Sequence, residues 1–214
     1  MKIKAVMIDF DGTLANTNGL IIKSHQHTFR TFLGHEGNEK QIKTTFGEPL
    51  WLTMEKFFGK EYEQEAVNVY RAFQKDRFAD LIEVFPGMDK AVKTLRSQGY
   101  KVALVTSRLK HSTYSGIERF GLLEDFDVIT TLDDITRHKP DPESINVTLE
   151  KLGLSPEEAV MIGDSRFDIL CAENAGCRSI LVDWSVTEEE ERIQLNADYI
   201  AKNAEDMIRW INEN

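Results

Sequence analysis

The sequence predicts an α/β fold, in which a Rossmann-like, doubly wound parallel sheet carries an inserted α-helical domain. The first observation is that short β-branched or aliphatic runs recur along the chain, each followed by a stretch with helical spacing. These runs lie at residues 3–8, 101–105, 127–130, 159–162 and 179–182. Near-continuous apolar strands that alternate with helices are typical of a parallel sheet covered on both faces.

The second observation is a long region in which only helical spacing is found. It runs from about residue 15 to residue 83, and its apolar positions are Ile22, Phe29, Leu33, Leu50, Met54, Phe57, Phe58, Ala66, Tyr70 and Phe73. This insertion is too long for a single crossover helix. We therefore expect residues 1–14 and 84–214 to form the core and residues 15–83 to form a helical cap domain, with hinges at 15–18 and 80–85.

Capping residues support the predicted helix boundaries. Asp141 is expected to cap a helix that has Pro142 in its first position and Gly153 just beyond its end. Ser155 and Glu158 have the spacing of a capping box in front of the next strand.

Composition excludes several classes of function. The formal net charge is −10, which argues against sequence-independent binding to nucleic acid. The first apolar run is too short for a membrane span and lacks the form of a signal peptide, so we expect no membrane association and a cytoplasmic location.

Cys171 and Cys177 lack zinc-site and redox-site spacing and are expected to be buried thiols. The acidic run 188–191 is expected to be a solvated helix face. A monomer and a dimer both remain open.

Two aspartates follow the first predicted strand, in the hexapeptide of residues 9–14. Side chains two apart on an extended backbone point the same way, so Asp9 and Asp11 can face one pocket. Two carboxylates at such a short distance need a cation to offset their charge. Gly12 allows the backbone to turn sharply after them. The alternative is an ordinary turn, because Asp-Gly is a common turn signal. We favour the functional interpretation.

The next two predicted strands lead to hydroxyl and ammonium groups. Thr106 and Ser107 end the second strand and could bind phosphate oxygens, although a helix cap is the common role for such residues. Pro140 favours an extended backbone at Lys139, whose ammonium would balance paired carboxylates and bind phosphate. Taken alone, Lys139 would be an exposed surface lysine.

Two more aspartates follow the fourth predicted strand. Asp164 and Asp168 are four residues apart and would share a face of the first helical turn, one as a direct metal ligand and one holding a metal-bound water. Helix capping by Asp164 is the alternative, and it explains one acid but not the pair. All four segments end strands at the same edge of a parallel sheet, where open α/β folds bind ligands. The sequence thus predicts a single crevice.

With these motifs the chain resembles the haloacid dehalogenase-like superfamily of phosphatases. The motifs are D-F-D-G-T-L at 9–14, V-T-S at 105–107, K-P-D-P at 139–142 and G-D-S-x-x-D at 163–168. The helical insertion is similar to the cap of the phosphoglycolate phosphatase and β-phosphoglucomutase branch. The stretches 16–18, 20–22 and 27–28 look closer to the bacterial pyrophosphatase of the phosphoglycolate phosphatase-like group.

The resemblance implies a strand order of 5-4-1-2-3 and a magnesium-dependent reaction. Asp9 would attack phosphorus to give an aspartyl-phosphate, and Asp11 would act as the acid and base. Thr106 and Lys139 would hold the phosphoryl group, with Ser107 and Gly12 beside them. The ligands of Mg²⁺ would be Asp9, the Asp11 carbonyl and Asp164, with Asp168 in support.

The expected substrate is a small phosphorylated metabolite or pyrophosphate. Candidate specificity residues in the cap are Glu48, Trp51, His25 and Arg71, followed by His27 and Arg77. Each of these could equally pack or solvate a cap helix. A phosphosugar mutase with the same nucleophile is the main alternative. A non-catalytic phosphoacceptor switch of the receiver type is a remote one, since such a module does not need the helical insertion.

Overall fold

A computed structural model describes residues 2–184, 186, 192 and 194–214. The acidic run 188–191 lies outside the described residues. The strands are β1 (Ala5–Ile8), β2 (Ala15–Asn16), β3 (Glu83–Val84), β4 (Lys101–Val105), β5 (Val128–Thr130), β6 (Ala159–Gly163), β7 (Arg178–Val182) and β8 (Tyr199–Ala201). The α-helices are α1 (Asn18–Leu33), α2 (Glu39–Lys43), α3 (Leu50–Phe58), α4 (Glu63–Leu81), α5 (Met88–Ser97), α6 (Lys110–Arg119), α7 (Glu143–Leu152), α8 (Arg166–Ala175) and α10 (Ala204–Glu213).

A parallel sheet forms the centre of the larger part of the molecule. Its order is β5-β4-β1-β6-β7-β8. In the numbering of the five predicted strands this is the order 3-2-1-4-5, which is 5-4-1-2-3 counted from the other edge, with β8 added beside the fifth. Sequence reasoning missed β8, which is three residues long and has an exposed central residue. The α/β fold class and the predicted central position of the first strand are confirmed.

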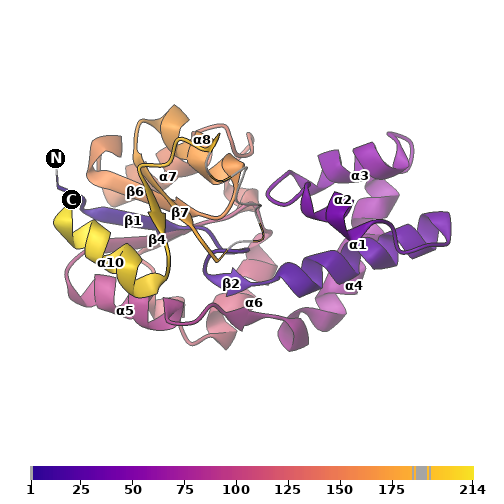
Figure 1. The fold of residues 1–214 in the computed structure, drawn as a ribbon, viewed down its shortest axis with the longest axis horizontal. Coiled ribbons are helices and arrows are strands. Elements are labelled where there is room, and N and C mark those ends of the chain that lie inside the picture. Colours follow the sequence, from indigo (N-terminus) through magenta and orange to yellow (C-terminus); the bar gives the residue numbers. More distant parts are fainter. Residues whose placement is uncertain (1, 185, 187–191, 193) are drawn as a thin grey trace.

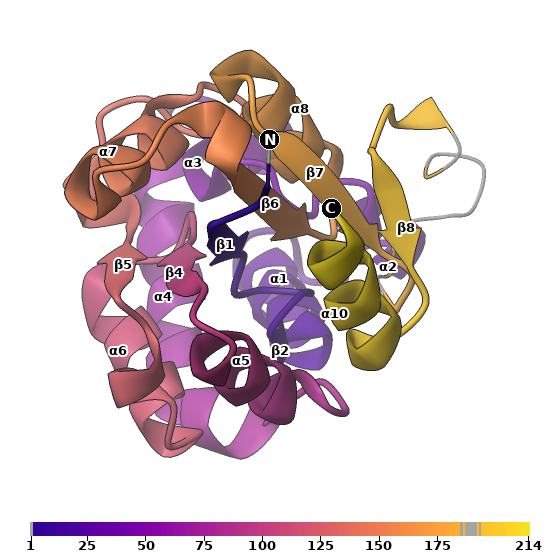
Figure 2. The same cartoon turned by 90° about the vertical axis from the view of Figure 1, so that its left-hand side faces the viewer.

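Helices cover both faces of this sheet (Figure 2). Alternate residues of β1, β4 and β6 enter different clusters, as the two-residue period of a strand requires. Val6 and Ile8 of β1 pack with α5 and α10, whereas Ala5 and Met7 pack with α7 and α8. All four residues are fully buried, which explains why β1 appears in the sequence as a continuous apolar run.

Helices α1–α4 form a separate group at one end of the molecule (Figure 1). Their small apolar cluster is built on Met54, Ala66, Val67 and Tyr70. The two segments predicted as hinges contain β2 and β3, which pair as a short antiparallel ribbon. The chain therefore leaves the sheet and returns to it through adjacent strands. Among the described residues, no helix combines the length and the apolar character that crossing a bilayer requires.

The helix boundaries agree with most of the predicted caps. Ser155 and Glu158 form the expected capping box, and Gly153 ends α7 in the left-handed conformation. The start of α7 differs from the prediction, because Pro142 occupies the N-cap position rather than the first helical position. The Asp141 side chain still accepts a hydrogen bond from the Glu143 backbone N–H at 3.0 Å.

Helix α6 packs closely against Phe10 of the first motif. Phe10 is fully buried, and a Cβ added to Gly116 of α6 would lie 2.6 Å from Phe10 Cζ.

We expect Gly116→Ala to lower the free energy of unfolding by about 1–3 kcal/mol through overpacking. Gly19→Ala is the matched control, because a Cβ there meets nothing within 4 Å. It should change stability by less than about 1 kcal/mol. Urea unfolding of both variants tests this, and equal losses would contradict the packing account.

Candidate active site

The predicted site segments meet at the carboxyl edge of the sheet. Asp9 directly follows β1, Thr106 follows β4 and Asp164 follows β6. Lys139 lies in the connection from β5 to α7, and its side chain is buried with these groups. The strands β4, β1 and β6 are hydrogen-bonded neighbours, so their ends bring the three residues together.

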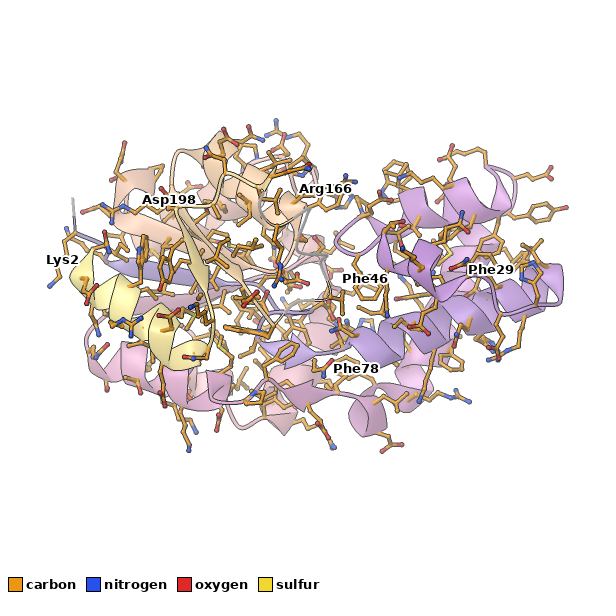
Figure 3. All side chains as sticks on the ribbon, viewed as in Figure 1. Lys2, Phe29, Phe46, Phe78, Arg166 and Asp198 are labelled. Atoms are coloured by element: carbon orange, nitrogen blue, oxygen red, sulfur yellow. The ribbon has the colours of Figure 1, made fainter. Side chains whose placement is uncertain are left out.

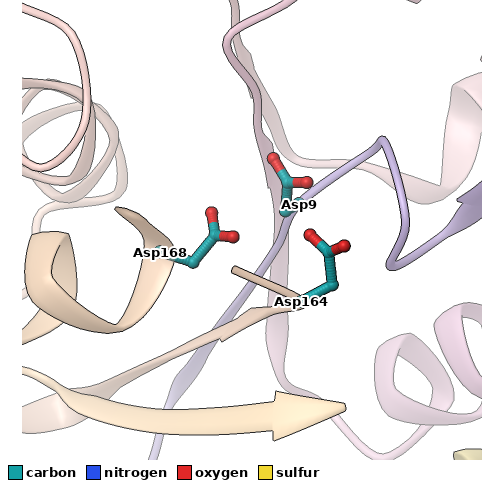
Figure 4. Close-up of side chains that lie close together, drawn as sticks. All are labelled: Asp9, Asp164 and Asp168. Atoms are coloured by element: carbon teal, nitrogen blue, oxygen red, sulfur yellow. The ribbon is translucent and has the colours of Figure 1, made fainter. Parts of the chain in front are cut away.

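Three carboxylates form a buried cluster. Asp9, Asp164 and Asp168 each offer an oxygen, and these oxygens all lie within 4.8 Å of one another. Their carboxylates converge on one space from β1, from the end of β6 and from α8 (Figure 4). Asp164 lies before the helix rather than in its first turn, because Ser165 is the N-cap of α8. Asp168 closes the capping box by accepting hydrogen bonds from Ser165.

Lys139 is the centre of the hydrogen-bond network. Its ammonium donates to Asp9 Oδ1 at 2.9 Å, to Asp168 Oδ1 at 2.6 Å and to the Val105 carbonyl at 2.8 Å. Burial acts to lower the pKa of Lys139, but the charges of Asp168 and Asp9 outweigh it and raise the pKa above its ordinary value. The ammonium therefore stays charged and fixes Asp9 Oδ1 in place. It is not the exposed lysine of the alternative interpretation.

The carboxyl of Asp9 is held in an environment that disfavours its charge. Burial raises the pKa of Asp9 to about 8, and the charges of Asp168 and Asp11 add to this, while Lys139 opposes it. More negative charge is gathered here than one ammonium balances. Clustered carboxylate oxygens are the donors that Mg²⁺ prefers, so the residues present fit a bound magnesium ion.

The carboxylate of Asp11 points elsewhere. It lies outside the three-carboxylate cluster and accepts a hydrogen bond from Arg108 Nη1 at 2.6 Å. Asp9 and Asp11 do line the same cavity, as their spacing predicted.

The backbone between Asp11 and Thr13 approaches Asp164 closely. Gly12 has φ of 78°, and a Cβ there would lie 2.1 Å from Asp164 Oδ2. A side chain at this position would displace the carboxylate, so glycine is required on both steric and conformational grounds.

The predicted hydroxyl groups also line the cavity. Thr106 and Ser107 both do so, and Thr106 is 2% exposed. Thr106 Oγ1 accepts a hydrogen bond from the Arg108 backbone N–H at 3.2 Å, which orders the turn after β4. This is a turn contact and not the helix cap that the sequence left open as an alternative, because the N-cap of α6 is Leu109.

The cavity has a volume of about 450 Å³ and lies between the sheet edge and helices α1–α4. Side chains from both parts surround the cavity, and Phe46 and Phe78 are among them (Figure 3). The cap candidates His25, Glu48 and Trp51 line the cavity, and so does Arg71.

Two other cap candidates lie elsewhere. His27 stacks on Phe73 with ring centroids 4.7 Å apart, and the Arg77 guanidinium lies 4.1 Å from the centre of the same ring. Neither is among the residues that line the cavity. They therefore have the packing role that the sequence allowed.

Glu48 joins the helical part to the core. Its carboxylate accepts from Lys56 Nζ at 2.7 Å and from Arg166 Nη2 at 3.3 Å, and Arg166 is the first residue of α8. This carboxylate is thus paired with two cations, one of which connects the loop before α3 to the start of α8.

Sequence reasoning assigned no role to Arg108 or Gln74, although both line the cavity. Arg108 follows the V-T-S motif directly, and that position was the available signal. Gln74 lies in a segment where the sequence shows only helical spacing, and it carried no signal of a role in the site.

Comparison with known proteins agrees with this geometry. The family model described as haloacid dehalogenase-like hydrolase matches residues 6–182. The chain belongs to the haloacid dehalogenase-like hydrolase family. It is 36% identical over 208 residues to pyrophosphatase PpaX of Halalkalibacterium halodurans, which covers 97% of this chain and 96% of the relative. It is 35% identical to pyrophosphatase PpaX of Bacillus cereus with the same coverage.

Solved structures show the same fold. A predicted phosphatase from Clostridium acetobutylicum superposes with a TM-score of 0.90 at 24% identity and full coverage of both chains. The family match and the pyrophosphatase relatives show that the chain is an enzyme, a haloacid dehalogenase-like hydrolase of the phosphatase type.

His25 generates a prediction for stability. It is 3% exposed, packs edge-on against Tyr70, and its Nδ1 has no hydrogen-bond partner among the described residues. Burial lowers the pKa of His25 from 6.5 to about 4. The folded protein thus keeps His25 neutral while the unfolded chain takes up a proton as the pH falls through 6.5. The stability contribution is complete above pH 6.5 and is lost as the pH falls towards 4, by up to about 3 kcal/mol.

We expect His25→Phe to remove this segment of the pH dependence. The unfolding free energy of the variant relative to the natural chain should increase by up to about 3 kcal/mol between pH 7 and pH 4. Denaturant unfolding across this range measures it, with His111→Gln, an exposed histidine, as the control. Parallel pH profiles for His25→Phe and the natural chain would contradict the burial account.

Proposed function

We propose that this hydrolase is a magnesium-dependent phosphatase that cleaves a small phosphate ester or anhydride through an aspartyl-phosphate on Asp9. The observation that carries the proposal is a buried carboxylate at a strand end, held by an ammonium 2.9 Å away and grouped with two further carboxylates. This arrangement fixes a nucleophile and gathers the ligands of a divalent cation at one point.

In the first step Asp9 attacks the substrate. Lys139 donates to Oδ1, so we assign Oδ2 as the attacking oxygen. A bond forms between Oδ2 and phosphorus while the bond from phosphorus to the leaving oxygen breaks, and Asp11 gives that oxygen a proton. Lys139 and Thr106 hold the transferred phosphoryl oxygens.

In the second step water releases the phosphate. Asp11 takes a proton from the water, whose oxygen bonds to phosphorus as the bond to Asp9 Oδ2 breaks. Inorganic phosphate leaves, and Asp9 is regenerated. The Asp9 carboxylate must form and then release an acyl phosphate, which explains why it must be anchored so firmly.

Magnesium is the proposed cofactor. Asp9, Asp164 and the Asp11 carbonyl would hold it, and Asp168 would support the site through Lys139 and Ser165. When bound, the ion offsets the negative charge of the phosphoryl group in the transition state.

Residues 15–83 act in this proposal as a cap over the site, joined to the core through the β2–β3 ribbon. The cap supplies the wall that touches the leaving group, including His25, Trp51 and Arg71. Lys75 of α4 adds a second cationic side chain to that wall.

Pyrophosphate is the first substrate to test. Cationic groups on the cap wall suit an anionic leaving group, and the two relatives reported above are pyrophosphatases. Phosphoglycolate also has an anionic leaving group, whereas a hexose phosphate has a neutral one. The three substrates therefore separate the electrostatic contribution of the wall.

We expect Asp9→Asn to lower kcat for phosphate release by at least about 10³-fold, because the amide cannot form the acyl phosphate. Asp125→Asn, which does not line the cavity, should retain full activity and serves as the control. Release of inorganic phosphate is measured with Mg²⁺ on pyrophosphate, phosphoglycolate and glucose 6-phosphate, with a chelator as a further arm. Isomerisation of β-glucose 1-phosphate without net phosphate release would instead identify a mutase and refute the hydrolytic proposal.

A further inference from the structure

Arg108 links the first motif to the cap. Its Nη1 donates to Asp11 Oδ1 at 2.6 Å, and its Nη2 donates to Gln74 Oε1 of α4 at 3.0 Å. The side chain is only 7% exposed. A guanidinium that is fixed at both ends in a buried site holds its partners in a defined geometry.

Aromatic rings restrict the same guanidinium. It lies 4.5 Å from the centre of the Phe78 ring and 5.6 Å from the centre of the Phe10 ring. Its Nε is buried without a hydrogen-bond partner among the described residues. Both terminal nitrogens already have acceptors and the planar group is covered by rings, so Arg108 is better placed to hold Asp11 than to bind substrate.

The contact on the cap side is itself ordered. Gln74 donates through Nε2 to the Tyr70 hydroxyl at 3.0 Å, which leaves Oε1 directed to Arg108. Tyr70 belongs to the apolar cluster of the helical part and is 6% exposed. A continuous path therefore runs from the packed interior of the cap through Gln74 and Arg108 to the Asp11 carboxylate.

We propose that Arg108 is a positioning residue that holds the Asp11 carboxylate for proton exchange and, through Gln74, makes this position depend on helix α4. The inference rests on the proposed function, in which Asp11 protonates the leaving oxygen. It assigns Arg108 no contact with the substrate. Replacing Arg108 should therefore slow a substrate more when its leaving group depends more strongly on proton transfer.

The dependence on the leaving group tests this directly. p-Nitrophenolate leaves with little help from an acid, whereas the alkoxide of glycerol 2-phosphate needs a proton. We expect Arg108→Met to lower kcat/KM by about 10²-fold for glycerol 2-phosphate and by less than about 10-fold for p-nitrophenyl phosphate, because general acid catalysis contributes about 10²–10⁴-fold. In the Asp11→Asn background, Arg108→Met should add no further loss.

Further variants keep the test informative if Arg108→Met folds poorly. Arg108→Lys retains the charge but lacks the fork that reaches Asp11 and Gln74 together, so the same bias should appear. Gln74→Leu keeps the Arg108–Asp11 pair and removes the cap contact, so the bias should be weaker but of the same sign. Arg119→Met, an exposed arginine at the end of α6, is the matched control and should change neither rate.

The outcomes are distinct. Equal losses on both substrates, or a raised KM with unchanged kcat, would overturn the positioning role and indicate a structural or substrate-binding arginine. An additional loss in the Asp11→Asn background would overturn it as well. Failure of the natural protein to release phosphate from these two esters and from pyrophosphate, phosphoglycolate and glucose 6-phosphate would overturn the proposed function itself, and with it this inference.

Discussion

The buried ammonium of Lys139 is the interaction on which the site depends. It bonds at once to the nucleophile candidate Asp9, to Asp168 on α8 and to the Val105 carbonyl at the end of β4. Three elements that are distant in the sequence are thereby held at one point. Without this positive charge, the buried carboxylates would repel one another, and leaving one charge unpaired in such a site costs about 3–5 kcal/mol.

The fold makes this convergence possible before any chemistry occurs. Strand β1 is hydrogen-bonded to β4 on one side and to β6 on the other, so the residues that follow the three strands share one edge. The central strand β1 is buried on both faces, and its alternate side chains pack in the two apolar clusters that flank the sheet. The sheet thus supports the carboxylates, while helices α1, α3 and α4 and the loop before α3 contribute the other wall of the cavity. Glu48 of that loop pairs with Arg166 of α8.

Much of this architecture could be predicted because it is encoded locally. The five apolar runs and the residues after them placed Asp9, Thr106, Lys139 and Asp164 at one edge, since parallel strands present their carboxyl ends together. Strand β8 was missed because its three residues carry too weak an apolar pattern to separate them from a loop.

Side-chain pairing across distant segments could not be predicted in the same way. The contact between Asp11 and Arg108 joins residues 97 positions apart, and the contact from Arg108 to Gln74 depends on where α4 lies over the sheet edge. The position of Asp164 before α8, rather than inside it, depends on Ser165 acting as the cap. Spacing alone does not distinguish these arrangements, because each is decided by tertiary packing.

Whether Asp9 is the nucleophile can be measured by trapping the enzyme during a single turnover. The reaction is quenched with acid, the protein is digested, and the phosphorylated peptide is mapped by mass spectrometry. We expect one added phosphoryl group on the peptide that contains Asp9, formed and lost at rates consistent with phosphate release. A phosphoryl group on any other residue, or rapid turnover with no adduct at any time, would contradict this role of Asp9.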